Sequence, residues 1–298
     1  MCSSPVCLRT EERTGDEMYK SVKKTKLLTA VIVAVIVIFL VILVGFPLAW
    51  MALSSFKPGV ELFTIPPKIM PENWTLEWYI QAFRNENVIH YFLNSLYIAT
   101  VVMVIDMIVG TLTAYSLTRF KFAGRKIILV SVLAAYCVPP IMLMLPMYRI
   151  MNTLGFSGSH LGVIIGHLTV TLPFSVWLMV SFFKKLPHEI DEAALMDGAN
   201  EWQVFARIDF PLCVSGVLST GIMAFIMSWN EFLLSSVLTN KESMKTLTVG
   251  LANYISSTHI DWGIIMALGT ITTIPVVILF ALVQKYFVEG MTAGAVKG

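Results

Sequence analysis

The stretch KKLPHEIDEAALMDGANEWQVFARIDFPL, residues 184–212, predicts two short helices joined by a glycine turn. Pro187 suits the first position of a helix, where its missing N–H costs nothing, and the carboxylates that follow it suit the positive helix end. Gly198 predicts the end of this helix. Asn200 predicts the cap of a second helix that runs to Arg207. The stretch is therefore expected to form a compact knob.

Two interpretations of this knob follow from its residues. Helices that lie on a membrane favour Lys and Arg on their polar face, whereas the first helix here is acidic. Ala193 and Ala194 lie beside those acids and offer a surface that another protein can approach closely. The residues favour docking of a soluble partner, and an amphipathic helix lying on the membrane is the alternative.

Apolar segments flank the knob on both sides along the chain. A membrane-spanning helix needs about 20 apolar residues, and transmembrane strands would be shorter, with alternating polarity. Six segments are long enough and apolar on all sides, which predicts an all-α membrane protein. They are Leu27–Leu53, Phe92–Leu117, Ile127–Tyr148, Ser159–Phe182, Leu212–Leu238 and Gly263–Tyr286.

The connecting segments predict the orientation of these spans. With the N-terminus inside the cell, 15 of the 21 Lys and Arg residues lie on the inner side, as positively charged inner loops require. Trp50, Trp229 and Trp262 then lie near the outer interface, where aromatic side chains gather. Both termini and the knob are therefore expected to be cytoplasmic.

The chain divides accordingly into five parts. They are a cytoplasmic tail (1–26), a first transmembrane helix (27–53), an extracellular segment (54–91), a core of five transmembrane helices (92–287) that includes the cytoplasmic loop 183–211, and a cytoplasmic C-terminal tail (288–298).

Composition agrees with a membrane protein and excludes several classes. Of the 298 residues, 56% are hydrophobic and 13% are charged, against about 25% charged in soluble domains. A net charge of +2 gives no reason to expect a nucleic-acid partner. The four cysteines lack the spacing of a metal site. The phosphate-binding pattern of ATPases is missing, so neither catalytic nor metal-ligating residues are predicted.

The loop 183–211 resembles the EAA loop of permease subunits in binding-protein-dependent ATP-binding cassette (ABC) importers, and we call it the EAA loop. Phe210 departs from the Leu that often precedes the proline of this pattern. The matching residues are Glu192, Ala193, Ala194, Gly198, Ile208 and Pro211.

Four further motifs resemble the smaller permease subunit of maltose-type importers, and only the N-terminal tail departs from that pattern. They are FLNSLYIA (92–99), SWNEFLLS (228–235), TLTVGL (246–251) and QKYFVEGMTAGAVKG (284–298).

The resemblance implies a fold, partners and a role for the EAA loop. It implies the type I ABC importer permease fold in a bacterial plasma membrane, with a second permease subunit, two ATPase subunits and an extracellular sugar-binding protein as partners. Sugar would be the substrate, and ATP and magnesium would be used by the partner ATPase, with no cofactor on this chain. The residues implied in ATPase coupling are Glu192, Ala193, Ala194, Asp197, Gly198 and Arg207.

Three polar residues inside the apolar segments are candidates for the translocation path. An acid at the bilayer centre costs about 2.5–3.5 kcal/mol on insertion scales, so Asp106 is expected to face other helices or a cavity. It either lines the translocation path or makes a structural hydrogen bond. Asn230 and Glu231, in the outer half of the fifth span, either line that path or hold two helices together.

Two other functions compete with a permease subunit. A self-sufficient secondary transporter would show paired repeats with broken helices and coupling acids at mid-membrane, but the halves of this chain show no clear repeat. A membrane enzyme would need His, Cys or carboxylate groups that converge at membrane depth, and the sequence predicts no such cluster.

Overall fold

The computed structural model describes residues 5–255 and 260–292. Within these ranges the regular structure is helical, apart from an isolated antiparallel bridge between Ile255 and Ile260. The last residues of the C-terminal motif and tail, 293–298, and the first four of the N-terminal tail lie outside the described residues. The fold class predicted from the apolar segments, an all-α protein, is confirmed.

The first half of the chain begins with one very long helix. The helices of this half are α1 (Pro5–Ser54), α2 (Gly59–Leu62), α3 (Glu77–Arg84), α4 (Glu86–Ile105), the π-helix η1 (Asp106–Gly110), α5 (Thr111–Arg119), α6 (Arg125–Tyr136) and α7 (Pro140–Thr153). Because α1 continues without interruption from Pro5, the boundary predicted at residue 26 is not a break in the helix.

The second half contains the EAA loop and the last spans. Its helices are α8 (His160–Phe183), α9 (His188–Met196), α10 (Glu201–Val204), the π-helix η2 (Phe205–Asp209), α11 (Phe210–Leu212), α12 (Val214–Trp229), α13 (Leu233–Leu238), the 3₁₀ turn η3 (Glu242–Met244), α14 (Leu247–Ala252) and α15 (Trp262–Thr292).

Four helices are long and apolar enough to cross a membrane, namely Thr29–Ser54, Glu86–Arg119, His160–Phe183 and Trp262–Leu282. The number rises to six if each of two bent pairs counts as one span. In one pair, α6 and α7 meet at 101°; in the other, α10–α11 and α12 meet at 74°. The chain is therefore a multi-pass membrane protein.

The predicted third and fifth spans are not single straight helices. Pro139 has an extended conformation (ψ 130°) and Pro140 begins α7; prolines lack the N–H that would continue α6. The fifth span was predicted over Leu212–Leu238, but α12 begins at Val214 and ends at Trp229, and α13 starts only at Leu233. The prediction of one continuous fifth span over Leu212–Leu238 was wrong, because the helix breaks between Trp229 and Leu233.

The spans pack around α8 and α12. The helix α12 packs on α4, α8 and α15, and α8 also packs on α5 and α6. A side chain on Gly216 of α12 would lie 2.6 Å from the Phe182 ring of α8, so glycine is needed for this close approach. The helix α1 contacts the bundle along α15, and its residues Val31–Val44 are almost all exposed.

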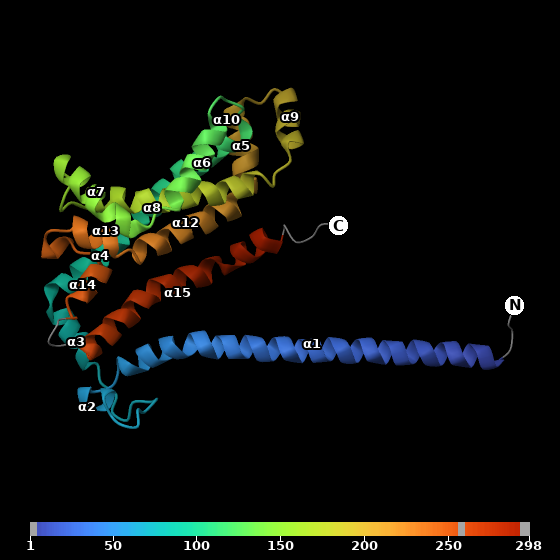
Figure 1. Cartoon of the computed structure of the whole chain (residues 1–298), viewed down its shortest axis with the longest axis horizontal. Helices are drawn as coiled ribbons and strands as arrows, with labels where there is room; N and C mark the ends of the chain where they lie inside the picture. Colours follow the sequence, from blue (N-terminus) through green and yellow to red (C-terminus); the bar gives the residue numbers. More distant parts are fainter. Residues whose placement is uncertain (1–4, 256–259, 293–298) are drawn as a thin grey trace.

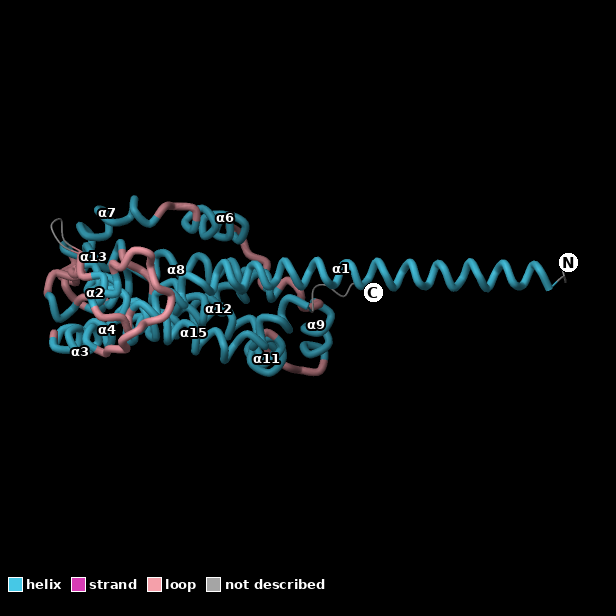
Figure 2. The backbone as a smooth tube through the Cα atoms, turned by 90° about the horizontal axis from the view of Figure 1, so that it is seen from below, coloured by secondary structure: helices cyan, strands magenta, loops and turns pink. Residues whose placement is uncertain are grey.

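The two ends of the bundle differ. The N-terminal end of α1 and the C-terminal end of α15 point to the same side of the molecule as α9, whereas α2, α3 and α14 lie on the opposite side (Figure 1). We call these the α9 end and the α2 end. Viewed from below, α6 and α7 follow one edge of the bundle, and α1 extends far beyond it on the α9 side (Figure 2).

Candidate functional site

The first helix of the EAA loop has defined ends. It begins at His188, with Pro187 as its N-cap, one residue later than predicted. At its C-terminus the N–H of Ala199 donates to the carbonyl of Ala194, and that of Gly198 to Leu195, each at 3.0 Å. This is the Schellman arrangement. It needs a left-handed residue, and Gly198 has φ +89°, so Gly198 ends the helix as predicted.

The second helix starts as predicted and ends later. The Asn200 side chain accepts the N–H of Gln203, and the Gln203 side chain accepts the N–H of Asn200, both at 2.9 Å. This reciprocal capping box fixes the helix start. The helical path then passes Arg207 and continues through η2 and α11 to Leu212 before it bends into α12.

Arg119, the last residue of α5, ties the EAA loop to the bundle. Its guanidinium donates to both carboxylate oxygens of Asp209, at 3.3 and 3.1 Å, and its Nε lies 2.9 Å from Oδ2 of Asp191 on α9. It also donates to the Leu186 carbonyl at 3.4 Å and to Nδ1 of His188 at 3.1 Å. The side chains of Arg119 and Asp209 are almost fully buried, so both helices of the loop are fixed to one point.

Asp191 has the less favourable surroundings of the two carboxyl groups that Arg119 contacts. Burial raises the pKa of its carboxyl, and the nearby charge of Asp209 raises it further, although the Arg119 charge opposes the shift. Its Oδ1 is buried without a hydrogen-bond partner among the described residues. Arg119 thus holds two carboxylates, of which Asp209 has the better geometry.

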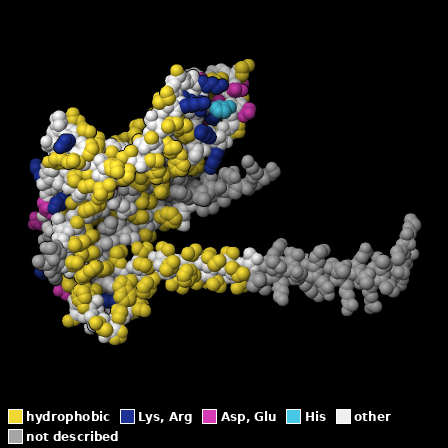
Figure 3. All heavy atoms as spheres, in the orientation of Figure 1, with side chains coloured by type: hydrophobic (Ala, Val, Ile, Leu, Met, Phe, Trp, Pro, Cys, Tyr) yellow, Lys and Arg dark blue, Asp and Glu magenta, His cyan; other side chains and the backbone are white. Residues whose placement is uncertain are grey.

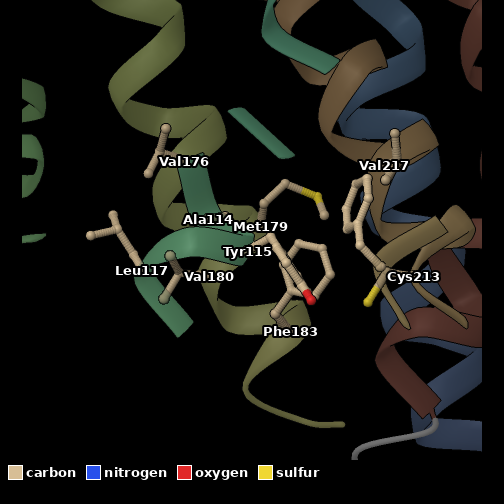
Figure 4. Close-up of a cluster of buried hydrophobic side chains, with 10 residues drawn as sticks. Ala114, Tyr115, Leu117, Val176, Met179, Val180, Phe183, Cys213 and Val217 are labelled. Atoms are coloured by element: carbon tan, nitrogen blue, oxygen red, sulfur yellow. The ribbon is translucent and has the colours of Figure 1, made fainter. Parts of the chain in front are cut away.

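An aromatic cluster packs between the second helix of the loop and the ends of α5 and α8. The Tyr115 ring of α5 lies 4.7 Å from that of Phe205 in η2 and 5.7 Å from that of Phe183 at the end of α8. Tyr115, Met179 and Phe183 converge between the helices, with Val217 and Cys213 of the α12 region on the other side (Figure 4). Because these side chains are buried, the second helix is part of the bundle core.

The α9 helix is, by contrast, mostly uncovered. Met196 is 89% exposed and Trp202, just after the turn, is 65% exposed. Glu192, Ala193, Asp197, Gly198 and Arg207 are exposed, and Ala194 is half-buried. The structure therefore brings the predicted coupling residues together at one end of the molecule, with large apolar groups beside them.

The predicted path residues are not all together. Asp106 is fully buried in η1. The hydroxyls of Thr171 and Ser175 on α8 face its carboxylate, yet neither completes a hydrogen bond of good geometry with it. Asp106 lies inside the bundle and away from Asn230 and Glu231, which adjoin each other at the break after α12.

Glu231 belongs to a buried polar network. Its carboxylate accepts the N–H groups of Leu234 and Ser235 at 2.7 and 2.9 Å, so it substitutes for the helical carbonyls that the break removes. Its Oε2 lies 3.2 Å from Nε2 of His167 on α8. His167 also lies 2.7 Å from the Ser228 hydroxyl and 2.9 Å from that of Ser235. The network joins α8, α12 and α13.

Asn230 lies on an open surface. It lines a cavity of about 380 Å³ between the break and α15. The polar side chains that share this cavity are those of Thr248, Thr272 and Thr273, and Phe232 adds an aromatic ring. The cavity thus offers an amide and three hydroxyls beside apolar walls.

Two residues that hold the site together, Arg119 and His167, are not predicted as site residues from the sequence. Arg119 counted only as one of the inner positive charges, and the sequence does not reveal that its partner is Asp209, 90 residues away. His167 likewise finds Glu231 through folding. The usable signal for both is an ionisable side chain inside or beside an apolar segment, because such a group requires a partner.

Comparison with known proteins agrees with this architecture. Residues 106–293 match the family described as "Binding-protein-dependent transport system inner membrane component". The chain is 38% identical over 256 residues to the inner membrane ABC transporter permease protein YcjP of Escherichia coli, covering 85% of this chain and 91% of that protein. It is 32% identical over 280 residues to the trehalose/maltose transport system permease protein MalG of Thermococcus litoralis, covering 92% and 99%.

A solved structure shares the fold. A chain of a bacterial ABC transporter involved in the import of the acidic polysaccharide alginate superposes with a TM-score of 0.73 at 21% identity, covering 87% of this chain and 96% of that one. The family match spans more than half of the present sequence. The chain therefore belongs to the family of inner membrane components of binding-protein-dependent transport systems.

Proposed function

We propose that this chain is a permease subunit of an ATP-driven, binding-protein-dependent sugar importer, in which the EAA loop receives the movement of a partner ATPase. The observation that carries the proposal is the construction of that loop. The loop exposes Glu192 and Met196 on its first helix and Trp202 on its second, while Arg119 ties its buried side to α5 through Asp191 and Asp209. A surface open to a partner is thus coupled rigidly to the membrane helices.

The proposal includes six spans with both termini inside the cell. Each bent pair, α6 with α7 and α10–α11 with α12, then belongs to one span. The excess of Lys and Arg in the segments at the α9 end supports this orientation. The ATPase, a cytoplasmic partner, would then meet α9 on its own side of the membrane.

Sugar as the substrate class is supported by two observations. Relatives at 30–32% identity are named as permeases for trehalose, trehalose/maltose and diacetylchitobiose. The cavity at Asn230 presents an amide, threonine hydroxyls and the Phe232 ring, which are groups that suit a ligand rich in hydroxyls and apolar ring faces. Asn230 would line the path directly, whereas Asp106 and Glu231 would hold its walls in place.

The remaining subunits complete the transporter. A second permease would form the other half of the path, and an extracellular sugar-binding protein would deliver the sugar at the α2 end. Two ATPase subunits would bind ATP and magnesium and perform the hydrolysis, since the sequence of this chain has no phosphate-binding loop.

The test is purification of the tagged chain from its own membranes, together with sugar uptake by the same cells. The wild-type chain is expected to bring down an ATPase subunit, and Glu192→Lys is expected to lose both the ATPase and the uptake. Glu86→Lys is the matched control, because Glu86 is an exposed acid at the other end of the bundle. Purification without an ATPase, or equal uptake in both variants, would contradict the proposal.

A further inference from the structure

A basic hollow lies at the α9 end, between the segment that links α5 to α6 and the end of α8. It measures about 830 Å³, and its lining includes Lys121, Arg125, Lys126 and Lys184. We propose that this hollow binds the headgroup of an anionic phospholipid from the inner leaflet. The proposal rests on the orientation given above, in which this end faces the cytoplasm.

The charge in the hollow has no counterpart in the surrounding protein. No acid is among its lining residues, and no ion pair of these four cations occurs in the part of the chain that the structure describes. Among the described residues, the Arg125 guanidinium donates only to the Phe120 carbonyl, at 3.4 Å. The neighbouring Arg119, by contrast, takes both Asp191 and Asp209. Four like charges around one hollow repel one another, and a bound anion would relieve that repulsion.

The helix that borders the hollow adds to its positive potential. Gly124 precedes α6 with φ +89°, and no side chain caps this helix. The free N–H groups and the dipole of its first turn favour a negative group. Lys121, Arg125 and Lys126 come from this segment and Lys184 from the end of α8, so two parts of the fold surround the same space.

The apolar part of the lining favours a lipid over a soluble anion. Phe122 and Ile127 border the hollow and are 42% and 71% exposed. Beyond it, α6 continues with exposed Ile128 and Val130. Lys and Arg side chains gather at this end of the molecule, and hydrophobic side chains cover the adjoining surface (Figure 3). A phosphate headgroup and an acyl chain would use both kinds of surface together.

The hollow is distinct from the surface proposed for the ATPase. The helix α6 follows one edge of the bundle, while α9 lies toward the other edge (Figure 2). The α9 surface is acidic and carries exposed Met196, whereas the hollow is basic. The two surfaces therefore suit partners of opposite charge.

The experiment is native mass spectrometry of the assembled transporter in detergent, supplied with phosphatidylglycerol or phosphatidylcholine of the same acyl chains. The wild type is expected to retain phosphatidylglycerol preferentially. Lys126→Gln and Lys184→Gln are each expected to weaken that retention about fivefold, the effect typical of one basic residue near an anionic surface. The control is Lys185→Gln, because Lys185 is the neighbour of Lys184 in the chain but contacts the Phe182 ring and does not line the hollow.

Four results would overturn the proposal. They are equal retention of the two lipids, equal loss in Lys185→Gln, displacement of phosphatidylglycerol by millimolar inorganic phosphate alone, and loss of the ATPase subunit from the Lys184→Gln complex with its lipid content unchanged. Sugar uptake is measured in parallel. Normal uptake without lipid preference would reject the lipid site and leave the proposed transport function intact.

Discussion

Arg119 donates two hydrogen bonds, at 3.3 and 3.1 Å, to the carboxylate of Asp209, which lies 90 residues away in the sequence. The contact fixes the last helix of the EAA loop to the end of α5. Because both side chains are buried, the pair is mechanically stiff and costly to break. Movement of the loop is therefore expected to carry α5, and with it η1 and α4, along the same path.

The first prediction concerns this pair. Arg119→Gln should lower the free energy of unfolding by about 3–5 kcal/mol, because it leaves buried carboxylates without a cation. Arg119→Lys should lower it less but still uncouple transport, since an ammonium group cannot bind Asp209 in the same two-pronged way. The measurements are the thermal unfolding midpoint of the purified complex and sugar uptake.

Arg125→Lys is the control for that pair of variants. Arg125 is half-buried, and its guanidinium bonds only one backbone carbonyl among the described groups. Its replacement should leave both the unfolding midpoint and uptake close to those of the wild type. Equal effects of Arg119→Lys and Arg125→Lys would mean that the two hydrogen bonds from Arg119 to Asp209 are not needed for coupling.

The second prediction concerns pH. The pKa of Asp191 is raised in the folded protein by burial and by Asp209, so the folded state holds this proton more tightly than the unfolded state does. Acidification from neutral pH toward the ordinary Asp pKa of about 3.9 should therefore stabilise the wild type relative to Asp191→Asn. The measurement is the difference between their unfolding midpoints as a function of pH. A difference that does not change with pH would contradict the assignment.

Local features of the EAA loop could be predicted from sequence, whereas its attachment could not. The Gly198 turn and the Asn200 cap depend on residues within four or five positions, so their spacing is sufficient. The Arg119–Asp209 pair depends on how α5 meets η2, which no local pattern encodes. The break at Asn230 was missed for a related reason: Glu231 can replace helical carbonyls there because His167, from another helix, lies beside its carboxylate.

The third prediction concerns the turn. Gly198 has φ +89° and open space around its missing side chain, so Gly198→Ala should cost about 1–2 kcal/mol of local strain without any clash. This strain should reduce uptake by disturbing the direction of α9. Gly198→Asn should retain more activity, because Asn tolerates the left-handed region better.

Gly124→Ala is a close match for Gly198→Ala. Gly124 has the same φ of +89° and equally open surroundings, but it precedes α6 and lies outside the EAA loop. We expect binding of the ATPase to persist in Gly124→Ala and to weaken in Gly198→Ala. If both variants bound the ATPase equally well, the Gly198 turn would not position the docking helix.

The fourth prediction concerns the buried network at the break. His167→Ala removes the partner of Ser228, Ser235 and Glu231, and a hydrogen bond to a charged group is worth about 1.5–3 kcal/mol. The unfolding midpoint should fall clearly. His160→Ala is the comparison, because His160 lies on the same helix and makes one hydrogen bond, at 2.9 Å, to the uncharged Asn94. A larger loss in His160→Ala would show that the network contributes little.

The last prediction separates the sugar path from the coupling machinery. Asn230 is exposed in the cavity bounded by Thr248, Thr272 and Thr273, and its Nδ2 donates only to the Ile226 carbonyl, at 2.9 Å, within the described structure. Its carbonyl oxygen therefore remains available to a sugar hydroxyl. Asn230→Ala should raise the sugar concentration needed for half-maximal uptake about fivefold, which corresponds to the loss of one hydrogen bond of about 1 kcal/mol.

The same variant should keep the ATPase bound, because Asn230 follows the C-terminal end of α12, whereas the EAA loop leads into its N-terminal end. Asn152→Ala is the control, since Asn152 is an exposed amide at the end of α7, outside the Asn230 cavity. An unchanged half-maximal concentration in Asn230→Ala would remove Asn230 from the path. A loss of ATPase binding would instead mean that the break after α12 belongs to the coupling machinery. A residue that contacts only sugar is not expected to affect the binding of a subunit at the other end of the bundle.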